Sequence, residues 1–141
     1  MSVNAFIDTN VFIYQLDTRD ARKHAIAERV VSDALANESA CISYQVVQEC
    51  LNTVLRKAQV ALDADAARAY LDTVLAPLVR IGASVALYRR GLELQQRWHF
   101  SFYDSLIVAA ALEAGCKRLL SEDLQHGQRI ESLRIENPFR K

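Results

Sequence analysis

Several residue types are scarce in this chain of 141 residues, and each shortage excludes a class of protein. The chain holds only four glycines and two prolines, and no Gly/Pro-rich linker divides it, so residues 1–141 are expected to form a single domain. No apolar run approaches the roughly 20 residues that cross a membrane. The first residues also lack the basic start and cleavage site of a signal peptide, which predicts a cytoplasmic protein without membrane contact.

The chain also has few cysteines and no net charge, and each of these excludes a further class of protein. Cys41, Cys50 and Cys116 are odd in number, far apart and set in apolar runs, so they are expected to be core residues and not zinc ligands. The 17 Lys and Arg residues balance 17 Asp and Glu residues, which leaves no overall positive field to hold a polyanion. Contact with nucleic acid must then come from local basic patches, and this argues against a general DNA-coating protein.

Apolar residues make up 51% of the chain, and their spacing predicts short strands that alternate with helices. A helix start is expected after the first strand, at Asp8-Thr9-Asn10. The expected strands are 3–7, 40–42, 79–81, 117–120 and 133–135. The expected helices are 21–36, 45–58 with Ser43 as N-cap, 63–75 ended by Pro77, 84–98, and one capped by Ser101 and ended by Gly115.

Strands separated by helices indicate a parallel sheet with helices on both faces, and ligands of such sheets bind at the carboxyl ends of the strands. Four acidic residues are placed to reach that edge. Asp8 and Asp123 each follow a strand, Glu49 lies under two turns beyond the second strand, and Asp104 sits in the first turn of a helix. We therefore treat these four as one candidate site.

Four carboxylates in one place repel one another, so either one carboxyl keeps its proton through a raised pKa or a cation neutralises the group. Because no histidine or cysteine accompanies them at zinc spacing, hard Mg²⁺ or Mn²⁺ is the expected ion. Such an ion activates water and polarises a phosphodiester, which predicts hydrolysis of a nucleic-acid backbone.

Each acid also has a simpler interpretation. Asp8 could form an Asx-turn or a helix cap, and Asp104 could complete a capping box with Ser101. Glu49 could be solvated on the polar face of its helix, and Asp123 could be an ordinary loop residue. Their joint placement favours the site.

Five segments of the sequence, in this order and at these separations, resemble the PIN-domain family, and most closely the VapC-type toxins of bacterial toxin–antitoxin pairs. The match spans nearly the whole chain except 63–97, which carries no motif. The segments are FIDTNV (6–11), QE (48–49), FYDSLIVAAA (102–111), LSEDLQHG (120–127) and NPF (137–139).

The resemblance implies an α/β fold, a three-layer α/β/α sandwich with a central, mostly parallel sheet, as a single PIN-like nuclease domain. It implies Mg²⁺, or Mn²⁺, bound by the four acids named above, with Thr9 and Ser121 as small polar groups that orient them. It implies an endoribonuclease that prefers single-stranded RNA and acts as a toxin. The implied partners are RNA, a second copy of the chain, and an antitoxin whose C-terminal segment fills a hydrophobic groove and brings a basic residue to the acids.

The residues that hold RNA are left open by the sequence. Aromatic and basic side chains at 97–100, together with Phe102 and Tyr103, could stack unpaired bases or could belong to the core or a dimer contact. His126 could assist proton transfer or be an exposed loop residue. The candidate cations, most of them expected to be solvated surface, are Arg56, Lys57, Arg89, Arg90, Arg97, Arg129, Arg134, Arg140 and Lys141.

Two other functions compete with the nuclease. A receiver-like domain or phosphohydrolase also uses Mg²⁺ at strand ends. However, Asp8-Thr9-Asn10 lacks the neighbouring acid of such sites, and Lys117 lies at the start of its strand and not at its end. A non-catalytic PIN-like binding module could keep the acids as a relic. Titration with metal would separate that module from an enzyme.

Overall fold

The computed structural model describes residues 3–57, 59–60 and 62–141, and within them six strands form one sheet in the order β3-β2-β1-β4-β6-β5. All neighbours are parallel except β5 and β6, which pair in antiparallel fashion. The strands are β1 (Ala5–Ile7), β2 (Ala40–Ser43), β3 (Val79–Ile81), β4 (Arg118–Leu120), β5 (Arg129–Ile130) and β6 (Leu133–Glu136).

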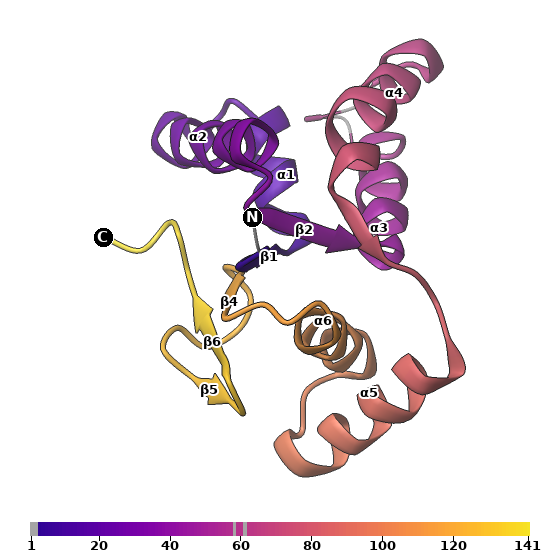
Figure 1. Cartoon of the computed structure of the whole chain (residues 1–141). Coiled ribbons are helices and arrows are strands. Elements are labelled where there is room, and N and C mark those ends of the chain that lie inside the picture. Colours follow the sequence, from indigo (N-terminus) through magenta and orange to yellow (C-terminus); the bar gives the residue numbers. More distant parts are fainter. Residues whose placement is uncertain (1–2, 58, 61) are drawn as a thin grey trace.

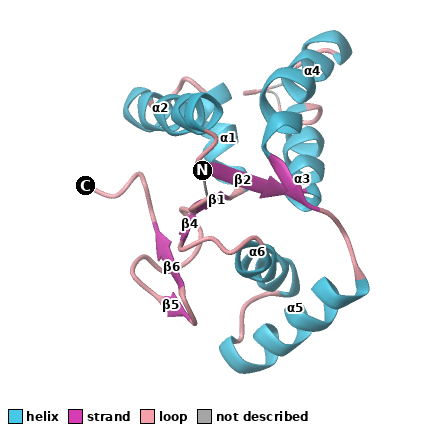
Figure 2. Cartoon of the chain, in the orientation of Figure 1, coloured by secondary structure: helices cyan, strands magenta, loops and turns pink. Residues whose placement is uncertain are grey.

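Helices cover both faces of this sheet (Figure 1), so the predicted three-layer α/β/α architecture is confirmed. α1, α2 and α3 lie on one face, with α4 beside α3, and α5 and α6 lie on the other (Figure 2). The helices are α1 (Thr9–Leu16), α2 (Ala21–Asn37), α3 (Tyr44–Val54), α4 (Ala64–Tyr70), α5 (Val85–Trp98) and α6 (Phe102–Glu113). A π-helical turn η1 (Leu71–Leu75) and a 3₁₀ turn η2 (Ala76–Leu78) connect α4 to β3.

The core lies where α6 meets the central strands. Every residue of β1 is buried, as is every α6 residue from Ser105 to Ala111, because a helix that is apolar all round must be covered on several sides. Cys41, Cys50 and Cys116 are also buried, as expected. In the described ranges, no helix combines the length and apolar character that spanning a membrane requires.

Most predicted elements are confirmed to within one or two residues, and four details differ. α3 ends at Val54, whose backbone carbonyl accepts a hydrogen bond from Leu62 N in the returning chain. The prediction that this helix continues through 55–57 was therefore wrong, and its last predicted residue, Ala58, lies outside the described residues. The helix capped by Asp63 changes to π and then 3₁₀ form after Tyr70. The short hairpin strand β5 was not predicted, and Ser43 occupies the N-cap position of α3 without a capping hydrogen bond from its side chain.

The strand order places a topological switch point between β1 and β4. From β1 the chain builds outward through β2 and β3 on one side, whereas β4, β6 and β5 extend the sheet on the other. The carboxyl ends of β1 and β4 meet there, since Ile7 pairs with Leu120. Ligand sites of open parallel sheets form at this position.

Packing around α6 generates a stability prediction. Ile107→Ala should lower the free energy of unfolding by about 2–5 kcal/mol, because Ile107 is buried under the sheet and its truncation leaves a cavity. Urea unfolding measures the loss. Leu92→Ala, at an exposed position on α5, is the control and should change stability by no more than about 0.5 kcal/mol. Equal effects of the two variants would contradict the assignment of the core.

Candidate active site

The carboxylate of Asp8 is held from both sides of the switch point. Asp8 follows β1 as the N-cap of α1, in extended conformation, and its Oδ1 accepts from Thr9 N at 2.8 Å. Its Oδ2 accepts from Ser121 Oγ at 2.8 Å, and Ser121 follows β4 directly. The carboxyl is therefore fixed in orientation while only 6% of the residue is exposed.

Glu49 joins this group from α3. Its Oε1 accepts from Thr9 Oγ1 at 2.6 Å, and its Oε2 accepts from Gln45 Nε2 at 3.3 Å, one helical turn earlier. Thr9 thus connects the two acids, donating its backbone N–H to Asp8 and its hydroxyl to Glu49. The orienting role implied for Thr9 has a geometric basis.

Asp123 is tied to the same edge by an amide. Asn10 donates from Nδ2 to Asp123 Oδ2 at 3.1 Å and accepts at Oδ1 from Glu122 N at 3.2 Å. The Asp123 N–H donates to Ser121 Oγ at 3.2 Å. Ser121 therefore touches two of the four acids, as a donor to one and an acceptor from the other.

Asp104 approaches from the opposite layer, on the first turn of α6. Its N–H donates to Ser101 Oγ at 3.1 Å, which confirms the cap predicted at Ser101. Gln45 Nε2 also donates to Tyr103 O at 3.0 Å, so one amide connects α3 to the start of α6. The four carboxylates are therefore carried by the N-cap of α1, by α3, by α6 and by the loop after β4.

The electrostatics show that these carboxylates act on one another. Burial raises the pKa of Asp8 to about 7, with smaller increases from the charges of Glu49 and Asp123, although the hydrogen bonds from Ser121 and Thr9 oppose the change. Burial also raises the pKa of Asp104, and the charges of Asp123 and Glu49 raise it further. The charges of Glu49 and Asp123 therefore act on both Asp8 and Asp104.

The donor set fits a hard divalent cation. Asp8 accepts hydrogen bonds from the Ser121 hydroxyl and the Thr9 amide, both neutral, so these bonds do not cancel its charge. Within residues 3–57, 59–60 and 62–141, no three His, Cys, Asp or Glu side chains form a ready-made metal cage. Mg²⁺ does not require such a cage, because it binds through one or two carboxylates and keeps several waters.

Two polar residues near Asp123, namely Glu122 and His126, have hydrogen-bond partners outside the acidic group. Glu122, adjacent to Asp123, accepts from Tyr14 Oη at 2.6 Å and pairs with Lys23, which keeps its charge out of the acidic group. His126 is half-buried and accepts at Nδ1 from Asn137 N at 3.0 Å, so its ring supports the C-terminal loop. The interpretation of His126 as an exposed loop residue was therefore wrong.

Two residues of the site carried no predicted role. Asn10 positions Asp123, and Gln45 positions Glu49 against α6. Their signals in the sequence are slight: Asn10 lies within Asp8-Thr9-Asn10, and Gln45 precedes Glu49 by four positions on one helical face.

The acidic residues lie near the switch point of a parallel α/β sheet, where ligand sites of such folds form. A family model described as the PIN domain matches residues 5–129, and the chain therefore belongs to the PIN-domain family. No curated protein matches the chain.

Several solved structures share this fold. VapC20 of Mycobacterium tuberculosis, a toxin that cleaves the sarcin-ricin loop, is 22% identical, with 85% of this chain and 92% of that chain covered and a TM-score of 0.62. A chain of a toxin–antitoxin complex from Klebsiella pneumoniae is 19% identical, with 96% of this chain and 98% of that chain covered and a TM-score of 0.63. VapBC2 from Rickettsia felis, solved with a DNA fragment from its promoter, is 18% identical, with 96% of this chain and 98% of that chain covered and a TM-score of 0.66.

The raised pKa of Asp8 predicts a pH-dependent cost to the metal-free fold. Because the folded state holds this proton more tightly than the unfolded state, the wild type should lose stability as pH rises from about 4 to about 7. Asp8→Asn removes that loss, so above pH 7 the variant should be more stable than the wild type by at most about 4 kcal/mol. This limit follows from the pKa of Asp8, which folding raises from 3.8 to about 7. Chemical unfolding in chelator at pH 4 and pH 8 measures the difference. If the stability difference between Asp8→Asn and the wild type were the same at both pH values, the raised pKa of Asp8 would be contradicted.

Proposed function

We propose that this protein is a Mg²⁺-dependent endoribonuclease that cleaves single-stranded RNA and acts as the toxin of a toxin–antitoxin pair. The observation that supports the proposal is that the charges of Glu49 and Asp123 raise the pKa values of both Asp8 and Asp104, near the switch point of a PIN fold. Asp8, Glu49, Asp104 and Asp123 would hold the ion, with Mn²⁺ as a substitute. The bound ion would supply an activated water and charge neutralisation at the scissile phosphate.

The chain's own residues would prepare that chemistry. Ser121 and Thr9 hold Asp8 and Glu49 in fixed orientation, so each can present an oxygen without reorganising when substrate binds. Asn10 does the same for Asp123. Orienting partners of this kind support metal affinity as well as rate.

The alternative functions receive less support from the geometry. A phospho-acceptor site needs a second acid beside the first, whereas Asp8 is followed by Thr9 and Asn10, which donate hydrogen bonds to Glu49 and Asp123. In a non-catalytic module, nothing would maintain the costly burial of a carboxylate beside two others. We therefore favour the enzyme over both.

The partners follow from the same acidic group. A basic side chain from an antitoxin would be attracted to the four carboxylates and would exclude the cation. Toxin–antitoxin complexes among the similar structures support this partner. We also propose a homodimer, since exposed apolar side chains remain at Leu55, just after α3, and at Val85 on α5.

A cleavage assay tests the function. Purified protein should cut labelled single-stranded RNA in Mg²⁺ or Mn²⁺ and not in chelator. Asp8→Asn and Asp104→Asn should each lower the rate by about 100-fold or more, because each removes one charge from the site. Asp33→Asn, at an exposed position on α2, is the matched control and should cut like the wild type. Full activity in both site variants, with melting curves showing folded protein, would refute the assignment.

A further inference from the structure

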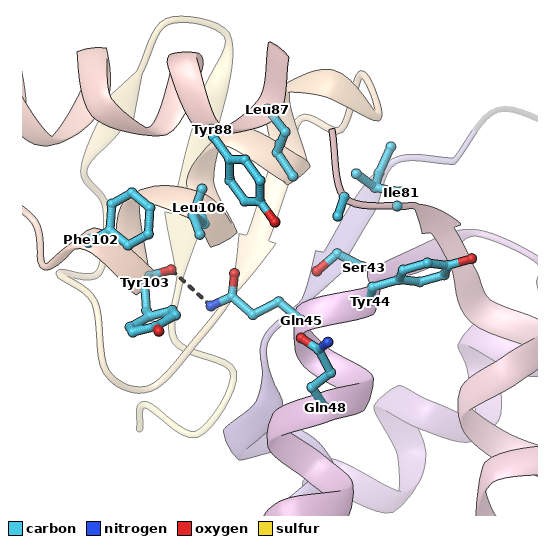
Figure 3. A pocket seen from close by; sticks show the side chains of 12 residues that line it. Ser43, Tyr44, Gln45, Gln48, Ile81, Leu87, Tyr88, Phe102, Tyr103 and Leu106 are labelled. Atoms are coloured by element: carbon cyan, nitrogen blue, oxygen red, sulfur yellow. Dashed lines mark hydrogen bonds between the residues drawn. The ribbon is translucent and has the colours of Figure 1, made fainter. Parts of the chain in front are cut away.

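A cavity of about 360 Å³ opens beside the acidic group, between the N-termini of α3 and α6 and the start of α5 (Figure 3). Aromatic rings of Tyr44, Tyr88, Phe102 and Tyr103 supply much of its wall, and all four residues are partly exposed. Among the described residues that line it, none is charged. Such a lining suits a flat, neutral, aromatic ligand.

Ser43 gives an independent sign of a ligand in this cavity. The residue is 3% exposed, and within the described chain its Oγ has no hydrogen-bond partner. It stands at the N-cap of α3 without capping the helix, and Figure 3 shows its oxygen directed toward the space near Tyr88. A buried hydroxyl without a partner is unfavourable, so a ligand that bonds to it would recover that loss. Ser105, the other such hydroxyl, does not line the cavity.

Gln45 supplies a second polar group with a fixed direction. Its Nε2 faces Glu49 Oε2 and Tyr103 O, which are both acceptors, so the amide nitrogen must occupy that position. Its Oε1 is therefore turned the other way, toward Tyr88 and Leu106 in Figure 3. An acceptor held in this way can receive a hydrogen bond from a base edge.

We propose that this cavity binds an unpaired nucleobase of the RNA, next to the phosphate that is cleaved. The inference deepens the proposed function and rests on it. Aromatic side chains stack on bases, and unpaired bases expose edges that a hydroxyl and an amide can read. Because Gln45 bonds both the cavity wall and Glu49, a base in the cavity lies one side chain away from the acidic group.

The chemistry of the lining favours a base over a protein segment. A basic antitoxin side chain would find no opposite charge here, since the acids lie beyond Gln45. The backbone phosphates, in contrast, would lie outside the neutral cavity and against the proposed metal. The cavity would thus set which nucleotide flanks the cut.

Mapping of cut sites tests the proposal. A randomised single-stranded RNA pool, cleaved and sequenced, should show that the wild type prefers one base beside the cut. Tyr88→Ala should lose that preference and raise KM by about 10-fold, with a smaller change in kcat. Tyr88→Phe keeps the ring and should retain both properties. Leu92→Ala, an exposed apolar position on the same helix outside the cavity, should match the wild type.

Ser43→Ala separates recognition from folding. The variant removes a buried hydroxyl that has no partner, so it should fold with equal or greater stability and still change the base preference. Wild-type preference and KM in both Ser43→Ala and Tyr88→Ala would overturn the proposal. A change in oligomeric mass or antitoxin affinity in Tyr88→Ala, with cleavage unchanged, would overturn it too and assign the cavity to a protein interface.

A binding measurement distinguishes failure of the cavity from failure of the nuclease. Fluorescence anisotropy of a labelled single-stranded RNA is recorded in chelator, which removes the cation and so prevents cleavage during the measurement. Binding that weakens about 10-fold in Tyr88→Ala supports the cavity even if the wild type cleaves no RNA. Equal affinity of the wild type and Tyr88→Ala for the labelled RNA would overturn the proposal that the cavity binds a base, whatever the cleavage assay shows.

Discussion

The repulsion among carboxylates gathered at one edge of the sheet is the constraint on which the rest of the site depends. Asp8 is buried at the end of β1, and burial raises its pKa to about 7. Glu49, Asp104 and Asp123 add negative charge from three other elements. A fold that keeps such an arrangement gives up stability at neutral pH unless a cation is bound.

The surroundings of the acids are arranged to keep them in place without cancelling their charge. Thr9, Asn10 and Ser121 donate neutral hydrogen bonds, while Lys23 is paired with Glu122 on the far side of the loop. The same edge carries the aromatic cavity, which is joined to Glu49 through Gln45. The acidic residues and the aromatic cavity are therefore neighbours, connected by one amide.

Patterns in the sequence predicted the location of the acids because strand ends in a parallel sheet meet at one edge, and Asp8 and Asp123 follow such ends. Other features depend on contacts between distant segments. β5 has two residues, too few for a periodic pattern, and α3 ends where Leu62 returns to Val54. The free hydroxyl of Ser43 could not be predicted either, because Ser at an N-cap normally bonds to its helix. Of the aromatic cluster, Trp98 and Phe100 pack against the core, and Phe102 and Tyr103 remain exposed.

Calorimetric titration with Mn²⁺ in the absence of RNA tests the central claim most directly. The account predicts binding by the wild type, with affinity at least about 10-fold lower in Asp8→Asn and in Asp104→Asn, and unchanged in Asp33→Asn. Binding of equal strength in all four proteins, or no binding by the wild type, would contradict it.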